Sequence, residues 1–267
     1  MTNPATIRIT LASAVLLLAG NLDARAGEAT TVEEVAAELA NPLAPITTLA
    51  ANVRVEMGNG PDDDTNYQLR LQPSFFKPFA DKSALLVRTI LPLRSINWPT
   101  SDHGLGDITI VPYYVPDVTS STFVGYGGAL ILPTATEDVL GIGKWAAGPA
   151  AIVAKTGKPI TWGGLVQHVW SFAGDDDRAD VSVTTVQPFF TYLLHDGWAA
   201  TVTSESTYNW EASVDNEWTV PLALSITKVM QFGGEFVSLG LAYVNYLEHP
   251  DFMTESEFRF SVTYVLR

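Results

Sequence analysis

The sequence contains no cysteine and few charged residues. Without cysteine the chain can form neither a disulfide nor a thiolate metal site, which suits passage through an oxidising compartment. Only 16% of the 267 residues are charged, whereas an average globular domain has about 25%. A chain with so little charge must hide most of its surface or face a medium other than water. The formal net charge of −14 argues against nucleic acid as a partner, because phosphate binding needs a basic face.

Long apolar runs are also missing, so the pattern predicts no helix that spans a membrane. The N-terminus does carry a shorter run, ITLASAVLLLAG, which follows Arg8 and precedes the small residues Ala24 and Ala26. About a dozen apolar residues are too few for a span, which needs about 20. The pattern predicts a signal peptide over residues 1–26, cleaved after Ala26. A buried N-terminal helix is the alternative.

Most of the remaining chain alternates polar and apolar residues with a period of two, which indicates strands with two different faces. Between 198 and 211, for example, threonines and Glu205 alternate with Trp198, Val202 and Trp210. The Gly- and Ala-rich strands between 122 and 155 alternate more weakly, so their register stays open. The pattern predicts about twelve strands, at 48–59, 66–76, 83–97, 105–115, 122–134, 144–155, 160–173, 181–193, 198–211, 218–231, 236–247 and 257–267.

The segments between these strands form two alternating sets. One set is mostly longer and acidic, as in GPDDDT, TATEDVLGIG and GDDDRAD, and the other is short, with lysines in FADK and TGKP. Aromatic residues bracket the apolar faces. Long outer loops, short periplasmic turns and aromatic girdles are typical of outer-membrane barrels, whereas a soluble barrel or sandwich carries its charge outside. We therefore predict an all-β fold over residues 47–267, a transmembrane antiparallel up-and-down β-barrel in the bacterial outer membrane.

Several stretches resemble one family of bacterial outer-membrane proteins. They are ANPLAPIT (40–47), HGLGDIT (103–109), GGALILPTATEDVLGIGKWAAGPAA (127–151), SFAGDDDRADV (171–181) and QPFFTYLLHDGW (187–198). The family is assigned to transport in the phenol meta-degradation pathway, and its members often carry the mistaken label neuromedin U. The resemblance implies a membrane β-barrel that transports aromatic or hydrophobic compounds, and it brings no catalytic or ligand-binding residues.

The end of the chain departs from the usual pattern of such barrels. Outer-membrane barrels usually end on an aromatic residue that the barrel assembly machinery reads, whereas this chain ends Tyr264-Val265-Leu266-Arg267. We expect Tyr264 and Leu266 to serve as the signal, with Arg267 as one extra residue. The partners predicted for the chain are this machinery, outer-membrane lipid with lipopolysaccharide, and a small-molecule solute.

If the apolar faces contact lipid, the alternate side chains point into the lumen. In a closed barrel the last strand pairs with the first, so arginines on the first three strands and the last would form a cationic wall. The predicted lumen-lining residues are Arg54, Glu56, Arg70, Arg88, Arg94 and Arg259, with Glu205 and Glu211 further round the ring. Opposed charges across a narrow lumen would sort solutes by charge and dipole. Alternatively, these residues pair with one another and only fill the lumen.

Residues 27–46 contain the one convincing helical pattern. Thr31 and Glu34 form a capping box, and Asn41-Pro42 ends the helix. Two roles are open for this segment. It could be a plug whose acids, Glu33, Glu34 and Glu38, lie in the lumen against the arginines, or a solvated leader.

The residues indicate no enzyme, cofactor or metal site. The four histidines have no metal-ligand spacing, and the acidic loops lack the spacing of a calcium loop. Those loops are solvated tips, or they bridge divalent cations in lipopolysaccharide. His168 and Ser171 lie on opposite faces of one predicted strand, which disfavours a hydrolase. The predicted function is passive passage of small solutes, and the alternatives are a lipid hydrolase in the barrel wall and a structural barrel with a blocked lumen.

Overall fold

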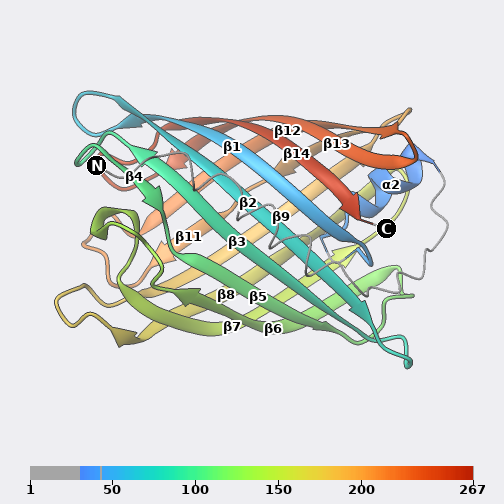
Figure 1. Cartoon of the computed structure of the whole chain (residues 1–267), viewed down its shortest axis with the longest axis horizontal. Coiled ribbons are helices and arrows are strands. Elements are labelled where there is room, and N and C mark those ends of the chain that lie inside the picture. The colour runs from blue at the N-terminus through green and yellow to red at the C-terminus, as the bar shows by residue number, and fades with distance from the viewer. Residues whose placement is uncertain (1–30, 43, 267) are drawn as a thin grey trace, which may run out of the picture. The chain divides into compact units, whose positions relative to one another are not determined.

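The computed structural model describes residues 31–42 and 44–266, so the predicted signal peptide at 1–26 and the terminal Arg267 lie outside the described residues. The fold is an antiparallel β-barrel whose long strands are tilted and wrap around a lumen (Figure 1). Strand β1 (Thr47–Asn59) pairs with β14 (Ser256–Leu266), from Thr47 opposite Leu266 to Met57 opposite Ser256. This pairing of the first and last strands closes the sheet.

The remaining strands follow one another around the barrel in chain order. They are β2 (Asp64–Pro78), β3 (Ala84–Ile96), β4 (Asp102–Leu105), β5 (Ile108–Val115), β6 (Thr122–Leu132), β7 (Lys144–Lys155), β8 (Ile160–Gly174), β9 (Ser182–Leu193), β10 (Trp198–Thr203), β11 (Ser206–Asn209), β12 (Trp218–Phe232) and β13 (Glu235–Glu248). Both β4 and β5 pair with β3, and both β10 and β11 lie between β9 and β12, so each pair is one interrupted strand. The predicted barrel of about twelve antiparallel strands is confirmed.

The two faces of the strands differ in the predicted sense. On the outer face, Phe260 is 53% exposed and Val202 is 42% exposed, whereas Glu257 on the inner face is fully buried. Aromatic residues gather on the outer face as well: the ring of Tyr208 lies 4.8 Å from that of Trp210 and 5.0 Å from that of Trp218. An apolar exterior around a polar interior is the reverse of a soluble protein and suits an environment of lipid.

The weakly alternating strands between 122 and 155 turn small and apolar side chains inward. With their neighbours they form one buried cluster, and we call six of its members on β6 to β8 the apolar wall: Ala129, Ala146, Ala150, Ile152, Leu165 and Val169. The lumen therefore has an apolar side on β6 to β8, and the rest of its wall mixes polar residues with buried apolar ones such as Val229 and Val244. Alternation is weak in these strands because both of their faces are apolar.

Helix α2 (Val32–Leu39) lies at the end of the barrel where the short turns are (Figure 1). Its capping box is present, since Glu34 N donates to Thr31 Oγ1 and Thr31 N donates to Glu34 Oε2, both at 3.3 Å. The helix packs against β10, β12 and β13. The turn before β10 holds Gly197 at a φ of +73°, and a Cβ there would lie 3.0 Å from Val32 Cβ. Among the described residues, no helix has the length and hydrophobicity to cross a membrane.

Candidate functional site

The arginines predicted to form a cationic wall lie on four consecutive strands, β3, β2, β1 and β14. Arg54, Arg70 and Arg94 line one lumen cavity of about 410 Å³ together with Glu56. Arg88 lies on the same strand as Arg94 but lines a different cavity, next to α2. We keep the name arginine wall for the set of Arg54, Arg70, Arg88, Arg94 and Arg259.

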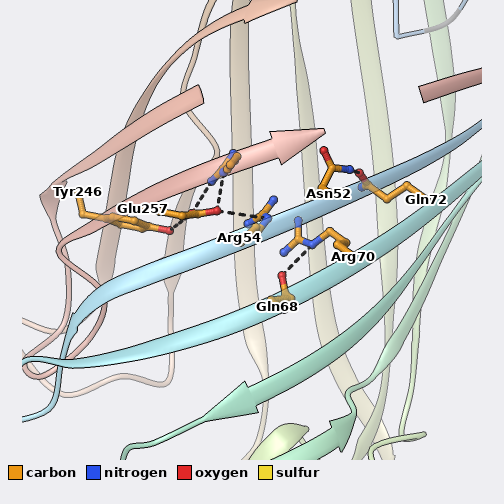
Figure 2. Close-up of polar contacts among 8 residues, drawn as sticks. Asn52, Arg54, Gln68, Arg70, Gln72, Tyr246 and Glu257 are labelled. Carbon is orange, nitrogen blue, oxygen red and sulfur yellow. Dashed lines mark hydrogen bonds and ion pairs between the residues drawn. The ribbon is translucent and has the colours of Figure 1, made fainter. Parts of the chain in front are cut away.

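Glu257 is the centre of the densest polar network in this wall (Figure 2). Its carboxylate accepts bonds from Arg259 Nε at 2.7 Å and Arg259 Nη2 at 2.9 Å, and lies 3.4 Å from Arg54 Nε. The hydroxyl of Tyr246 donates to the same carboxylate at 3.2 Å. A fully buried carboxylate is stable only when it is paired, and here two guanidinium groups share it. The cluster of Arg54, Glu257 and Arg259 therefore carries one net positive charge.

The strand register explains how this cluster forms. Arg54 stands directly opposite Arg259, and Glu56 stands directly opposite Glu257, so like charges face each other across the β1–β14 ladder. Direct like-charge pairs are destabilising, but diagonal neighbours in a ladder are within reach of long side chains. Arg54 reaches diagonally to Glu257, and this contact offsets the repulsion.

Other polar side chains of the wall are also bonded to one another. Arg70 Nε donates to Gln68 Oε1 at 3.1 Å, and Asn52 Nδ2 donates to Gln72 Oε1 at 2.8 Å (Figure 2). Glu205, in the break between β10 and β11, lines a second cavity of about 410 Å³ with Arg70 and Arg94. The acid therefore shares one lumen space with the basic wall.

Two predictions about acidic residues need correction: the position of Glu211, and the direction of the three acids of α2. Glu211 is an exposed residue of the turn after β11, so the prediction that it lies on the strand is wrong, because pairing there ends at Asn209. The side of α2 that faces the lumen carries Ala36, Leu39 and Ala40 rather than acids. Glu33 is exposed, Glu34 serves in the capping box, and Glu38 is half-buried.

The segment 133–143 has the composition of the other acidic loops, but it does not project outward as they do. It contains the short 3-10 helix η1 (Asp138–Leu140), and Leu140 is buried. Val139 lines both of the 410 Å³ cavities, so it stands between them in the lumen. We call this segment the inward loop, and it narrows the lumen beside the arginine wall.

Asp107 holds the inward loop from within the barrel wall. In the break between β4 and β5, its carboxylate accepts bonds from the backbone N–H groups of Thr134 (3.0 Å), Ala135 (3.1 Å) and Ile142 (2.6 Å). Such bonds to an ionised acceptor are stronger than neutral ones. Gly141 allows this close approach, since a Cβ there would lie 2.6 Å from Asp107 Oδ1.

Arg178 holds the same loop from the side facing the outer loops. Its guanidinium donates to the carbonyl oxygens of Asp138 at 2.8 Å, Ile142 at 3.3 Å and Gly141. The segment that carries Arg178 is itself tied to β7, because Lys144 Nζ donates to Asp180 Oδ1 at 3.0 Å. This bond holds the pKa of Asp180 below its ordinary value. Two residues of the acidic GDDDRAD stretch therefore have structural roles: Arg178 holds the inward loop, and Asp180 ties the segment to β7.

The residues considered for a hydrolase are not arranged as a catalytic pair. His168 Nδ1 lies 2.8 Å from Thr184 Oγ1, and its ring lies 5.3 Å from that of Trp170. Ser171 Oγ instead donates to Asp180 Oδ1 at 3.3 Å and accepts from Val181 N at 3.0 Å. Across residues 31–42 and 44–266, no group of three or more His, Asp or Glu side chains is placed to hold a metal ion.

Sequence reasoning missed three residues that organise this lumen: Glu257, Asp107 and Arg178. The alternation places Glu257 on the polar face, but only the β1–β14 register brings it to Arg54. Asp107 sits in GLGDIT, which resembles a turn motif. Its role depends on a loop that follows two strands later, after β5 and β6, and no local pattern could reveal that contact.

Two solved structures share this fold. An outer membrane channel from Pseudomonas putida F1 superposes with a TM-score of 0.64 at 16% identity, over 83% of this chain and 94% of that one. The NanC porin superposes with a TM-score of 0.55 at 12% identity, over 82% of this chain and 100% of that one. Identities this low show a common fold alone. No family model matches the sequence, and no curated protein matches it.

Proposed function

We propose that this protein is an outer-membrane channel through which small solutes diffuse passively. The observation that carries the proposal is a closed barrel with an apolar exterior and a charged, cavity-containing interior. A barrel with a purely structural role would need no such cavities beside its charged side chains. The similar fold of the Pseudomonas putida channel and of the NanC porin supports the same function and an outer-membrane location.

The selectivity of the channel would come from the arginine wall opposite Glu205. The five arginines of the arginine wall, Arg88 included, outnumber the four acids that line the lumen cavities or pair with the wall, which are Glu56, Asp107, Glu205 and Glu257. A fixed positive excess in a narrow lumen raises the local concentration of anions. We therefore expect a preference for anions, with the size limit set by the inward loop and by α2. Neutral solutes would pass as their size allows.

The solute class is nominated by the family resemblance, which implies aromatic or hydrophobic compounds. The apolar wall supports this class, because it offers an apolar surface along one side of a polar lumen. Lipopolysaccharide around the outer loops and the barrel assembly machinery at the C-terminal strand are the partners that this location requires.

Planar-bilayer recording tests the function. The chain without residues 1–26 and the same chain without residues 27–46 are compared in a KCl gradient. We expect a steady conductance that rises when residues 27–46 are removed, because α2 narrows one end of the lumen. The reversal potential should indicate anion preference. If neither form conducts, the channel proposal fails and the protein is a structural barrel with a blocked lumen.

A further inference from the structure

A cavity of about 290 Å³ lies between α2 and the barrel wall, apart from the two larger cavities at the inward loop. Ala36 and Leu39 of the helix, its C-cap residue Ala40, and Pro42 form one side of it. Small-molecule pockets have volumes of about 300–1,000 Å³. This cavity is therefore of a size for one small organic molecule.

The wall of this cavity has two chemically different sides. Ile152 and Leu165 of the apolar wall, together with Phe189, supply an apolar side. The other side carries hydroxyl groups from β9, β10, β12, β13 and β14, such as those of Thr191 and Ser261. A purely hydrophilic solute would leave the first side without a partner. The hydroxyl groups of Thr191 and Thr201 bond each other, but a purely apolar solute would offer no partner to other hydroxyl groups there, such as that of Ser261, and this costs free energy.

Arg88 is the one charged side chain among the described residues that line this cavity. The ion pairs formed by described residues involve Arg54, Arg259 and Lys144, and none includes Arg88. A guanidinium group without a carboxylate attracts an anion, and its planar fork matches a carboxylate with two parallel bonds. A single arginine balances a single negative charge, so a dianion fits less well than a monoanion.

We propose that this cavity is a binding site for a small monocarboxylic acid with an apolar body. The carboxylate would pair with Arg88, and the apolar body would lie against Ile152, Leu165 and Phe189. The inference rests on the proposed function because it names a class of solute that the lumen would pass. It adds a residue, Arg88, at which such a solute pauses before it passes α2.

Equilibrium binding tests this site without requiring an open pore. The full mature chain in lipid nanodiscs is titrated calorimetrically with sodium hexanoate, and empty nanodiscs give the baseline. Hexylammonium has the same body with the opposite charge, and acetate has the charge without the body. We expect saturable binding of one hexanoate per chain, and much weaker binding of both comparison ions.

Two arginine variants on β3 make the test specific. Arg88→Gln should weaken hexanoate binding by about tenfold or more, because it removes a charge-assisted pair, whereas Arg88→Lys should retain part of the affinity. Arg94→Gln is the comparison variant: Arg94 lines the other two cavities, so its loss should lower anion preference in conductance but weaken hexanoate binding far less than Arg88→Gln does. Leu165→Thr should weaken hexanoate binding without creating affinity for hexylammonium.

The outcomes separate this inference from the channel proposal. Equal hexanoate affinity in Arg88→Gln and the wild type, equal binding of hexylammonium, or no saturable binding would each overturn the site. Anion conductance without hexanoate binding refutes the site and leaves the channel. If hexanoate binds but neither the mature chain nor the chain without residues 27–46 conducts, the site stands and the channel proposal is refuted.

Discussion

At the scale of single residues, Glu257 decides the charge balance of the arginine wall. It is the most buried charged side chain in the lumen, and it binds arginines on two neighbouring strands. An arginine on a buried wall needs a partner, and removing that partner leaves its charge uncompensated. The net charge at the arginine wall therefore depends on Glu257, which is paired with two of the arginines.

Two substitutions of Glu257 separate its charge from its hydrogen bonds. Glu257→Ala should destabilise the barrel by up to about 3–5 kcal/mol, the cost of breaking a buried pair, and should increase anion preference. Glu257→Gln removes the same charge but keeps an acceptor for Tyr246, so its loss of stability should be smaller. Denaturant unfolding and the reversal potential measure the two effects. Equal stability of both variants and the wild type would contradict this role.

At the scale of elements, the inward loop shows how far a loop can depart from its composition. Its acidic, glycine-containing sequence is typical of an exposed loop, yet backbone bonds to Asp107 and Arg178 hold it inside the barrel. Most strand positions, by contrast, followed from alternation, because outside β6 and β7 most strands separate a polar from an apolar environment. A loop has no such periodic constraint, so its course depends on contacts made elsewhere in the chain.

Asp107→Ala should release the inward loop. The variant loses three bonds to an ionised acceptor, each worth about 1.5–3 kcal/mol, so Val139 should leave the space between the two larger cavities. We expect higher single-channel conductance and more current noise than in the wild type. Asp138→Ala is the matched control, since the backbone carbonyl of Asp138, not its carboxylate, accepts from Arg178. Identical conductance in Asp107→Ala and the wild type would show that this loop does not limit the pore.

At the scale of the whole molecule, the barrel is organised by the direction in which alternate side chains point. Val166 and Gln167 are neighbours near the middle of β8, yet Val166 is 47% exposed on the outer face while Gln167 lines a lumen cavity. The outer residue contacts lipid in the proposed location, and the inner one contacts the solvent of the lumen. The same substitution should therefore destabilise the barrel at Val166 but not at Gln167.

An arginine placed at each of these positions tests the orientation. Val166→Arg should destabilise the barrel by about 2–4 kcal/mol, the cost of an arginine on the lipid face near the bilayer midplane. Gln167→Arg should leave folding nearly unchanged and alter the conductance instead. Reversible unfolding in lipid vesicles measures the first effect. A larger loss of stability in Gln167→Arg than in Val166→Arg would contradict the assignment of the two faces.

The positions of about twelve strands, the apolar outer face, the position of α2 along the chain and the inward direction of the arginine wall all follow from the sequence. These features are local, since a period of two, a capping box and a proline act over a few residues. The tertiary structure alone decided that Glu257 joins Arg54 to Arg259, that the segment 133–143 turns inward, and that apolar residues of α2 face the lumen. Each of these depends on contacts between residues far apart in the chain, for which one sequence carries no local signal.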